Sequence, residues 1–146
     1  MGLITDIAAA VVTELNAPPS PFSLPFTAVR AYRPAFDLVA LKSLQVTVVA
    51  KGVEISSLAR STNQHDVTVD VAVQKKVAPE AAGLAELDGL MTLTEEIADF
   101  LRLKRLTAFP TALWNKTIHV PVYAPEHLEQ KQVFTSVLSM TFRVVR

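Results

Sequence analysis

The chain has 146 residues, of which 50% are hydrophobic and 19% are charged, and its 14 basic residues balance 14 acidic ones. This length suits one domain with its own core, and a net charge of zero excludes a general electrostatic attraction to nucleic acid or to an anionic membrane. The chain contains no cysteine, which excludes disulfides, thiolate chemistry and cysteine-ligated zinc.

The first predicted element is a helix over residues 4–16, ITDIAAAVVTELN. Apolar residues recur there at helical spacing and form one stripe: Ile4, Ile7, Ala8, Val11, Val12 and Leu15. Thr5 or Asp6 is the expected N-terminal cap. The outer face holds Ala9, Ala10 and Thr13, with the charges Asp6 and Glu14. Its side chains are small enough for close packing against another subunit, although alanine is also common simply because it favours helices.

A proline-rich connector, residues 17–25, follows and cannot form regular structure. Phe22 and Leu24 are its expected anchors in the core. Residues 26–32 alternate well enough for a first strand, whereas residues 37–44 are ambiguous because their leucines also share one helical face.

A long β-hairpin is predicted between residues 44 and 74. Gly52 is expected to mark a bulge or a bend in its first strand. Residues 56–64, SSLARSTNQ, are predicted to be a polar loop with Arg60 near its tip.

The second strand of this hairpin, HDVTVDVAVQKKV, alternates valines with other residues, so that successive side chains point to opposite sides of the sheet. The valines are expected in the core: Val67, Val69, Val71 and Val73. The other side carries too few charges for plain solvent and is predicted to face another subunit: Thr68, Asp70, Ala72 and Gln74. Lys75 and Lys76 are expected where the sheet ends and water or a channel begins.

A second helix is predicted between about residues 81 and 106. Its apolar face comprises Leu87, Leu90, Met91, Leu93, Ile97, Phe100, Leu101 and Leu103. Acidic residues crowd its first half, while Arg102, Lys104 and Arg105 crowd its end, which suits the helix dipole and explains this basic cluster without nucleic acid.

The last part of the chain predicts two more strands. Residues 117–123 form an edge strand, since Pro121 lacks a backbone donor, and residues 124–130 form a loop with one helical turn. Residues 133–145, VFTSVLSMTFRVV, form a long strand whose free backbone is expected to be offered to a neighbour.

This order of elements predicts an α+β fold, in which a mostly antiparallel, mixed β-sheet with a long β-hairpin carries two α-helices on one face. The whole chain, residues 1–146, is expected to be a single domain. The N-terminal residues lack a basic region and a long apolar run, so neither a signal peptide nor a membrane span is expected.

Catalytic and cofactor chemistry has no recognisable pattern in the chain. The three histidines, His65, His119 and His127, lack the spacing of a metal site, so hydrogen-bonded histidines are expected instead. Four glycines are too few for phosphate-binding loops or a serine nucleophile elbow. Glu95 and Glu96 are adjacent on a helix, point in different directions and are expected in solvent. We therefore expect no enzyme, no metal and no cofactor.

Half of the residues are hydrophobic and few are charged, which predicts that partners cover some apolar surface. A sparsely charged monomer is the alternative.

Four segments together resemble small tail-terminator or tail-completion proteins of long-tailed bacteriophages. They are the helix ITDIAAAVVTELN, the hairpin VTVVAKGVEISSLARSTNQHDVTVDVAVQKK, the helix LDGLMTLTEEIADFLRL and the strand FTSVLSMTFRV. The likeness lies in their order, length and texture, and covers most of the chain. The proline-rich connector and residues 109–130 have no counterpart.

The resemblance implies a virion protein of the tail or neck, made in the host bacterial cytoplasm, that forms a ring, typically six-fold. Such a ring ends the tail tube, docks the head connector, and lets DNA pass only as cargo. On this reading the hairpin tip contacts a neighbour or the tube through Ser57, Arg60 and Asn63, and deleting residues 57–64 abolishes ring formation or docking. Lys75 and Lys76 are candidates for lining the channel.

Two other classes stay open. One is a different phage structural part, such as a head-completion or tail-tube subunit. The other is a small soluble enzyme or ligand-binding domain, which a deep pocket with converging polar groups would indicate.

Overall fold

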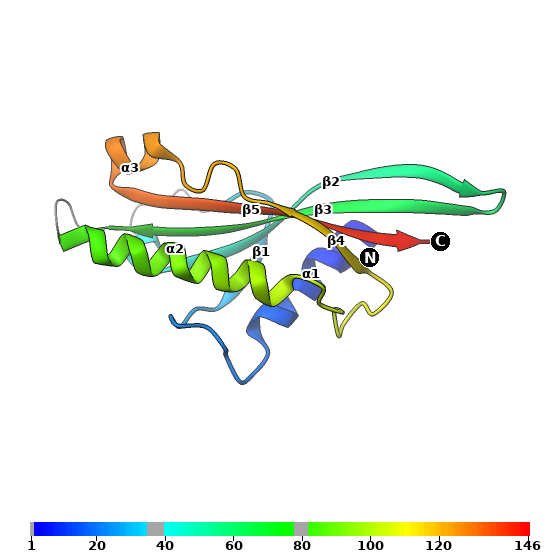
Figure 1. Cartoon of the computed structure of the whole chain (residues 1–146), viewed down its shortest axis with the longest axis horizontal. Helices are drawn as coiled ribbons and strands as arrows, with labels where there is room; N and C mark the ends of the chain where they lie inside the picture. The colour runs from blue at the N-terminus through cyan, green and yellow to red at the C-terminus, as the bar shows by residue number, and fades with distance from the viewer. Residues whose placement is uncertain (1, 35–39, 78–81) are drawn as a thin grey trace.

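The computed structural model of the protein describes residues 2–34, 40–77 and 82–146. It has an α+β fold in which five strands form one mixed sheet, in the order β1-β2-β3-β5-β4 (Figure 1). The elements are α1 Leu3–Asn16, β1 Ala28–Ala31, the 3-10 helix η1 Ala40–Lys42, β2 Gln45–Ala59, β3 Thr62–Lys76, α2 Ala82–Leu101, β4 Leu113–Ile118, α3 Pro125–Lys131 and β5 Val133–Val145.

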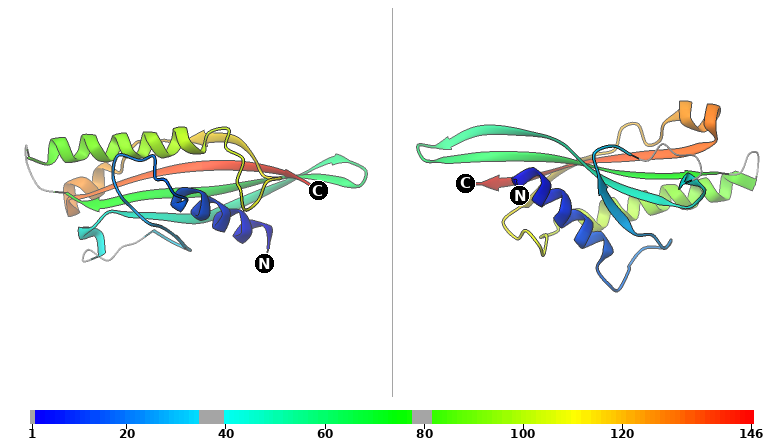
Figure 2. Two further views of the ribbon diagram at one scale, coloured as in Figure 1. Left: turned by 90° about the horizontal axis from the view of Figure 1, so that it is seen from below. Right: turned by 180° about the vertical axis from the view of Figure 1, so that it is seen from behind.

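The sheet is mixed because β1 runs parallel to β2, whereas every other neighbouring pair is antiparallel. The predicted long hairpin is confirmed as β2 and β3. A register shift between Ala50 and Gly52 is the bulge expected at that glycine. The two-helix prediction is also confirmed, since α1 and α2 lie on the same side of the sheet (Figure 2).

We call the side of the sheet under α1 and α2 the helix face. The four valines of β3 lie there, and all are 0% exposed, as the alternation predicted. The core adds alternate residues of β5 and the inner stripes of both helices: Phe134, Leu138, Met140, Phe142, Ile7, Val11, Leu15, Leu90, Leu93, Ile97 and Leu101. Burial of these side chains is the main contribution that holds the sheet and the helices together.

Helix α1 differs from its prediction at two charged or polar positions. Its N-cap is Gly2, and the Thr5 hydroxyl donates to the Gly2 carbonyl at 2.9 Å instead of capping a backbone N–H. Glu14 is only 7% exposed, because its carboxylate accepts from the Thr107 N–H at 2.8 Å and lies 3.8 Å from Lys104 Nζ. The prediction of an exposed Glu14 is therefore wrong.

Helix α2 ends at Leu101, five residues before the predicted limit of 106. Leu103 adopts a left-handed backbone with φ 59°, which stops the helix, and its side chain is 76% exposed rather than part of the apolar face. The basic cluster of residues 102–105 therefore follows the last turn, and Lys104 lies 4.4 Å from the centre of the Phe100 ring.

The polar segment 56–64 is not a loop. Both strands continue through it to a two-residue turn, Arg60 and Ser61, so that Ser57 pairs with Asn63 and Ala59 with Thr62. The residues are polar because they have no core to pack on, not because the backbone turns there.

The last two strands occupy different places from those expected. β4 covers residues 113–118 rather than 117–123, and it does form an edge of the sheet, with Pro121 in the segment that follows it. β5 has the predicted bounds but lies between β3 and β4, so the prediction of a free C-terminal strand is wrong. The helical turn expected over 124–130 is α3.

The connector between α1 and β1 is irregular, as predicted, and Phe22 is its anchor. The Phe22 ring lies 5.1 Å from Phe26 and 5.2 Å from Phe100, centre to centre. Leu24 is also partly buried against the core. Of the ambiguous segment 37–44, residues 37–39 lie outside the described ranges, and Ala40–Lys42 form η1.

Candidate assembly interface

The most exposed part of the fold is the far half of the β2–β3 hairpin. β1 pairs with β2 only over Val46–Val49, and β5 pairs with β3 only as far as Gln64. Residues 57–62 therefore project past β5 as a two-stranded ribbon, and we call residues 53–63, which include this ribbon and the adjoining open edge of β2, the arm (Figures 1 and 2). A ribbon without a core of its own is a surface that a partner can cover.

The arm carries large apolar side chains in solvent. Val53 is 39% exposed, Ile55 59% and Leu58 56%. A second exposed apolar set lies on and just after β4, at the opposite edge of the sheet: Leu113, Ile118, Val120, Val122 and Tyr123. Two such sets at opposite edges are an arrangement suited to protein contacts.

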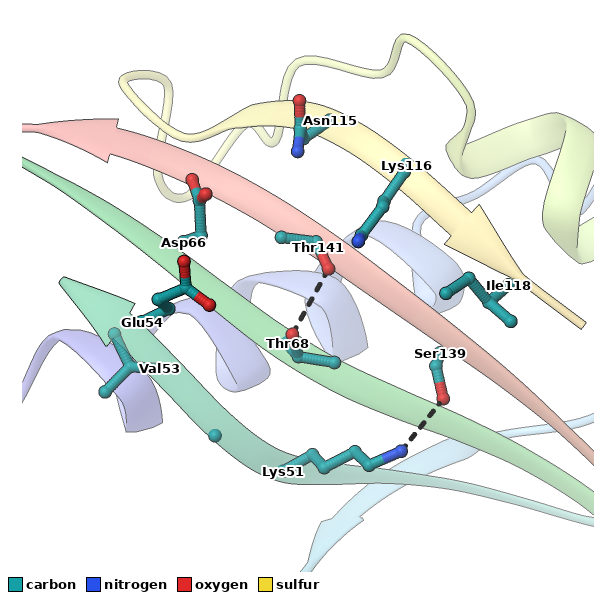
Figure 3. Close-up of a pocket in the computed structure, with 11 residues that line it drawn as sticks. Lys51, Val53, Glu54, Asp66, Thr68, Asn115, Lys116, Ile118, Ser139 and Thr141 are labelled. Atoms are coloured by element: carbon teal, nitrogen blue, oxygen red, sulfur yellow. Dashed lines mark hydrogen bonds between the residues drawn. The ribbon is translucent and has the colours of Figure 1, made fainter. Parts of the chain in front are cut away.

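The side of the sheet away from α1 and α2, which we call the polar face, holds a shallow cavity of about 370 Å³ (Figure 3). It is lined by Lys51, Gly52, Val53, Glu54, Asp66, Thr68, Asn115, Lys116, Ile118, Ser139 and Thr141. The Thr68 and Thr141 hydroxyls lie 3.2 Å apart on neighbouring strands, and Ser139 donates to Asp70 at 2.6 Å.

Charges on the polar face are largely paired within the chain. Arg143 Nε donates to Asp66 at 2.9 Å, and this hydrogen bond lowers the pKa of the Asp66 carboxyl and raises the pKa of Arg143. Lys51 lies 3.9 Å from Asp70. The face therefore offers mostly neutralised polar groups, which suits a protein surface better than an ionic ligand.

The predicted tip residues are all on the arm. Ser57 and Asn63 are opposite each other near the turn, and Arg60 is in the turn itself; all three are exposed. Their role as contacts remains a prediction.

The predicted subunit surface on β3 is only partly open. Thr68 and Asp70 are partly exposed on the polar face, but Ala72 is 0% and Gln74 2% exposed. At that end of the sheet η1 packs on β3 and α3 packs on β5, so the chain covers its own polar face. The placement of Gln74 on an open surface is therefore wrong. Among the residues described, the buried Gln74 Oε1 has no hydrogen-bond partner.

The two lysines that end β3 differ. Lys75 Nζ lies 3.0 Å from Glu86 of α2, so its charge is paired inside the subunit. Lys76 is exposed and is the better candidate for a channel.

The predicted outer face of α1 is also divided. Thr13 is exposed and Ala9 is partly exposed, whereas Ala10 is 2% exposed and belongs to the core. The placement of Ala10 on the outer face is wrong, because α1 packs on both β1 and β2 and so buries a wider face than its main stripe.

The histidines make the hydrogen bonds expected of structural residues in two of three cases. His127 Nδ1 lies 3.0 Å from the Thr135 hydroxyl, and His119 Nε2 lies 2.6 Å from Ser136 Oγ. Ser136 donates to the Val122 carbonyl at 2.6 Å, so His119 must carry the proton on Nε2 and donate it to Ser136. Within the described ranges, the buried His65 Nδ1 has no partner.

His119 makes stability depend on pH. Burial lowers its pKa below the usual 6.5, so the unfolded chain binds a proton more readily than the folded chain. Stability is therefore expected to fall as the pH drops below 6.5 towards the folded-state pKa. The His119→Gln variant can still donate a hydrogen bond to Ser136. We expect its melting temperature to fall less between about pH 7.5 and 5.5 than the melting temperature of the natural chain. Equal losses in both chains would contradict this assignment.

Several of these residues had no signal in the sequence. Lys51, Asp66 and Arg143 are scattered over three strands, and only the sheet register brings Asp66 beside Arg143. Ile55 belongs to a predicted strand and Leu58 to a predicted polar loop, and only the structure shows that both are large apolar side chains in solvent.

None of the helices in the described ranges combines the length and the apolar character needed to cross a bilayer.

Comparison with known proteins identifies the fold but no family. No family model matches the chain, and no curated protein matches it. Among solved structures, a chain of the virion of a native gene transfer agent (GTA) particle is similar over 100% of both chains, with a TM-score of 0.62 and 16% identity. At this identity the likeness shows a shared fold.

Proposed function

We propose that this chain is a structural, non-enzymatic subunit of a phage-like virion. The observation that carries the proposal is the likeness to a GTA virion chain over the full length of both chains. The exposed apolar residues at both edges of the sheet support a role in assembly.

Within the virion, we propose that the chain forms the ring that terminates the tail tube and joins the tail to the head connector. This finer role rests on the resemblance to tail-terminator proteins in the order and texture of the elements. The proposed partners are other copies of the chain, the tail tube protein and the connector proteins. DNA passes through the ring as cargo, and Lys76 is the proposed channel residue.

The nearest rival is another phage structural part, a head-completion or tail-tube subunit. The two differ in how assembly ends, because a tube subunit adds copies without limit whereas a terminator closes into one ring.

Native mass spectrometry of the purified chain, alone and with tail tubes, tests this role. We expect one closed species, typically six chains, and electron microscopy should show it at one end of each tube. Open-ended polymers would favour a tube subunit, and a monomer that stays monomeric beside tubes would refute the ring.

A further inference from the structure

We propose that neighbouring copies join by strand addition, with the outer edge of β2 in one copy pairing with the outer edge of β4 in the next. This inference rests on the proposed ring and specifies its contact. The β2 edge beyond Val49 and the β4 edge beyond Leu113 have no strand beside them in the described part of the chain.

The direction of the backbone groups on the arm follows from its register. Asn63 exchanges both of its backbone hydrogen bonds with Arg146, at 2.8 and 2.9 Å, so they point towards β5. Ser57 is opposite Asn63 and therefore forms a non-hydrogen-bonded pair with it. Because hydrogen-bonded and non-hydrogen-bonded pairs alternate in an antiparallel ladder, Ser57, Ile55 and Val53 direct their N–H and C=O groups away from β3. These groups form an open template for a further strand.

The same alternation applies to β4. The backbone N–H and C=O groups of Arg146 point towards β3. Every second residue along a strand directs these groups to the same side, so those of Phe142 and Met140 also point towards β3. Their partners Trp114 and Thr117 therefore direct their backbone groups away from β5, on the outer edge of the sheet. Each copy thus has two strand edges with unpaired backbone groups, the outer edge of β2 and the outer edge of β4.

The topology makes these two edges compatible. β2, β3, β5 and β4 are antiparallel in succession, so β4 runs opposite to β2. A neighbour placed edge to edge, with its helix face on the same side, would therefore present β4 antiparallel to β2. The contact joins two different edges, and repeating it around a closed rotation produces a ring rather than a dimer.

Charge complementarity fixes the register. Glu54 pairs with Asp66 and Lys116 pairs with Thr141, so both side chains are on the polar face, one at each edge. Both residues are exposed, and neither forms an ion pair within the described ranges. Setting Glu54 opposite Lys116 of the next copy also places Val53 opposite Thr117. These two residues direct their backbone groups outwards, so the ladder and the charge pair agree.

Charge reversal in two separate chains tests this contact. Glu54→Lys alone and Lys116→Glu alone should each raise the concentration for half-assembly roughly tenfold, because like charges then meet at every contact. An equal mixture of the two variants should assemble like the natural chain, since alternating copies restore every pair. A pair within one chain cannot be restored by mixing, so this outcome identifies a contact between copies.

Cysteine variants measure the same contact directly, because the natural chain has no cysteine. Residues 54 and 116 of one chain are three strand spacings apart, about 14 Å, too far for a disulfide. Oxidised Glu54→Cys/Lys116→Cys chains should therefore form a ladder of linked copies up to the ring number. Glu54→Cys alone should stay unlinked, and dimers of it would overturn the proposal in favour of arm-to-arm pairing.

The two levels of the proposal fail differently. If the natural chain forms rings and the single reversals assemble equally well, or if mixing restores nothing, strand addition at this register is wrong and the ring stands. If the natural chain forms no ring with or without tubes, both the proposed ring and the proposed strand addition are wrong.

Discussion

A chain whose arm is shortened should fold but should no longer form rings. The change replaces residues 55–65 by Asn-Gly, which suits a two-residue turn between the paired residues Glu54 and Asp66. It removes the exposed Ile55 and Leu58 and most of the open edge of β2. None of residues 55–65 belongs to the hydrophobic core, so the core should lose little.

The measurement is native mass spectrometry beside a thermal melt. We expect only monomer at concentrations where the natural chain is assembled, with a melting temperature within a few degrees of it. The matched control replaces only Arg60 and Ser61 by Asn-Gly, which keeps the arm at its natural length, and it should assemble. Assembly of the shortened chain would show that the arm is dispensable, while failure of the control would assign the effect to the tip and to Arg60.

Truncation of Phe142 to alanine should destabilise the fold most among single substitutions. Phe142 is 0% exposed near the C-terminal end of β5, opposite Val67 of β3 and Trp114 of β4. Removing such a ring from a packed core costs about 3–5 kcal/mol, through lost burial and the cavity left behind. A domain of this size has about 5–15 kcal/mol of stability, so the variant should be partly unfolded at physiological temperature.

Urea denaturation of the two chains gives this free energy of unfolding. Ile55→Ala is the control, because Ile55 is 59% exposed and its truncation should change the stability by less than about 0.5 kcal/mol. Similar midpoints for Phe142→Ala and the natural chain would mean that β5 is not in the core.

The sequence predicted elements well where one side chain pattern ran long enough. β5 alternates over 13 residues, and the structure has the same bounds and the same buried side. The valines of β3 were equally informative. Periodicity reports which side of a strand is buried, and the hydrophobic core of this protein lies on one side of the sheet.

Periodicity does not report what lies beside a strand. Nothing in the residues of β5 distinguishes an edge from the centre of a sheet, so its place between β3 and β4 could not be predicted. The polar residues 56–64 predict a loop, yet a ribbon in solvent needs no apolar side. The alternation in β3 predicts an exposed Gln74, since the strand alone does not indicate that η1 and α3, from distant segments, cover that end of the sheet.

The candidate contact depends on register in the same way. Glu54 and Lys116 are 62 positions apart in a sequence of balanced charge, and neither stands out. Their place on one side of the sheet, at opposite edges, requires three strand pairings to be known. Sequence reasoning could predict a contact at the hairpin tip, but it could not predict an edge strand that would receive it.

The central position of β5 has a consequence for biosynthesis. β5 follows all the other described elements in chain order, yet it must enter between β3 and β4. Until the ribosome has released it, β3 exposes one side of its backbone over Gln64–Lys76, and β4 has no sheet to join. The chain therefore completes its fold only after translation of β5. In that interval the unpaired edge of β3 is a site where two unfinished chains can aggregate, and we expect chaperones to protect it.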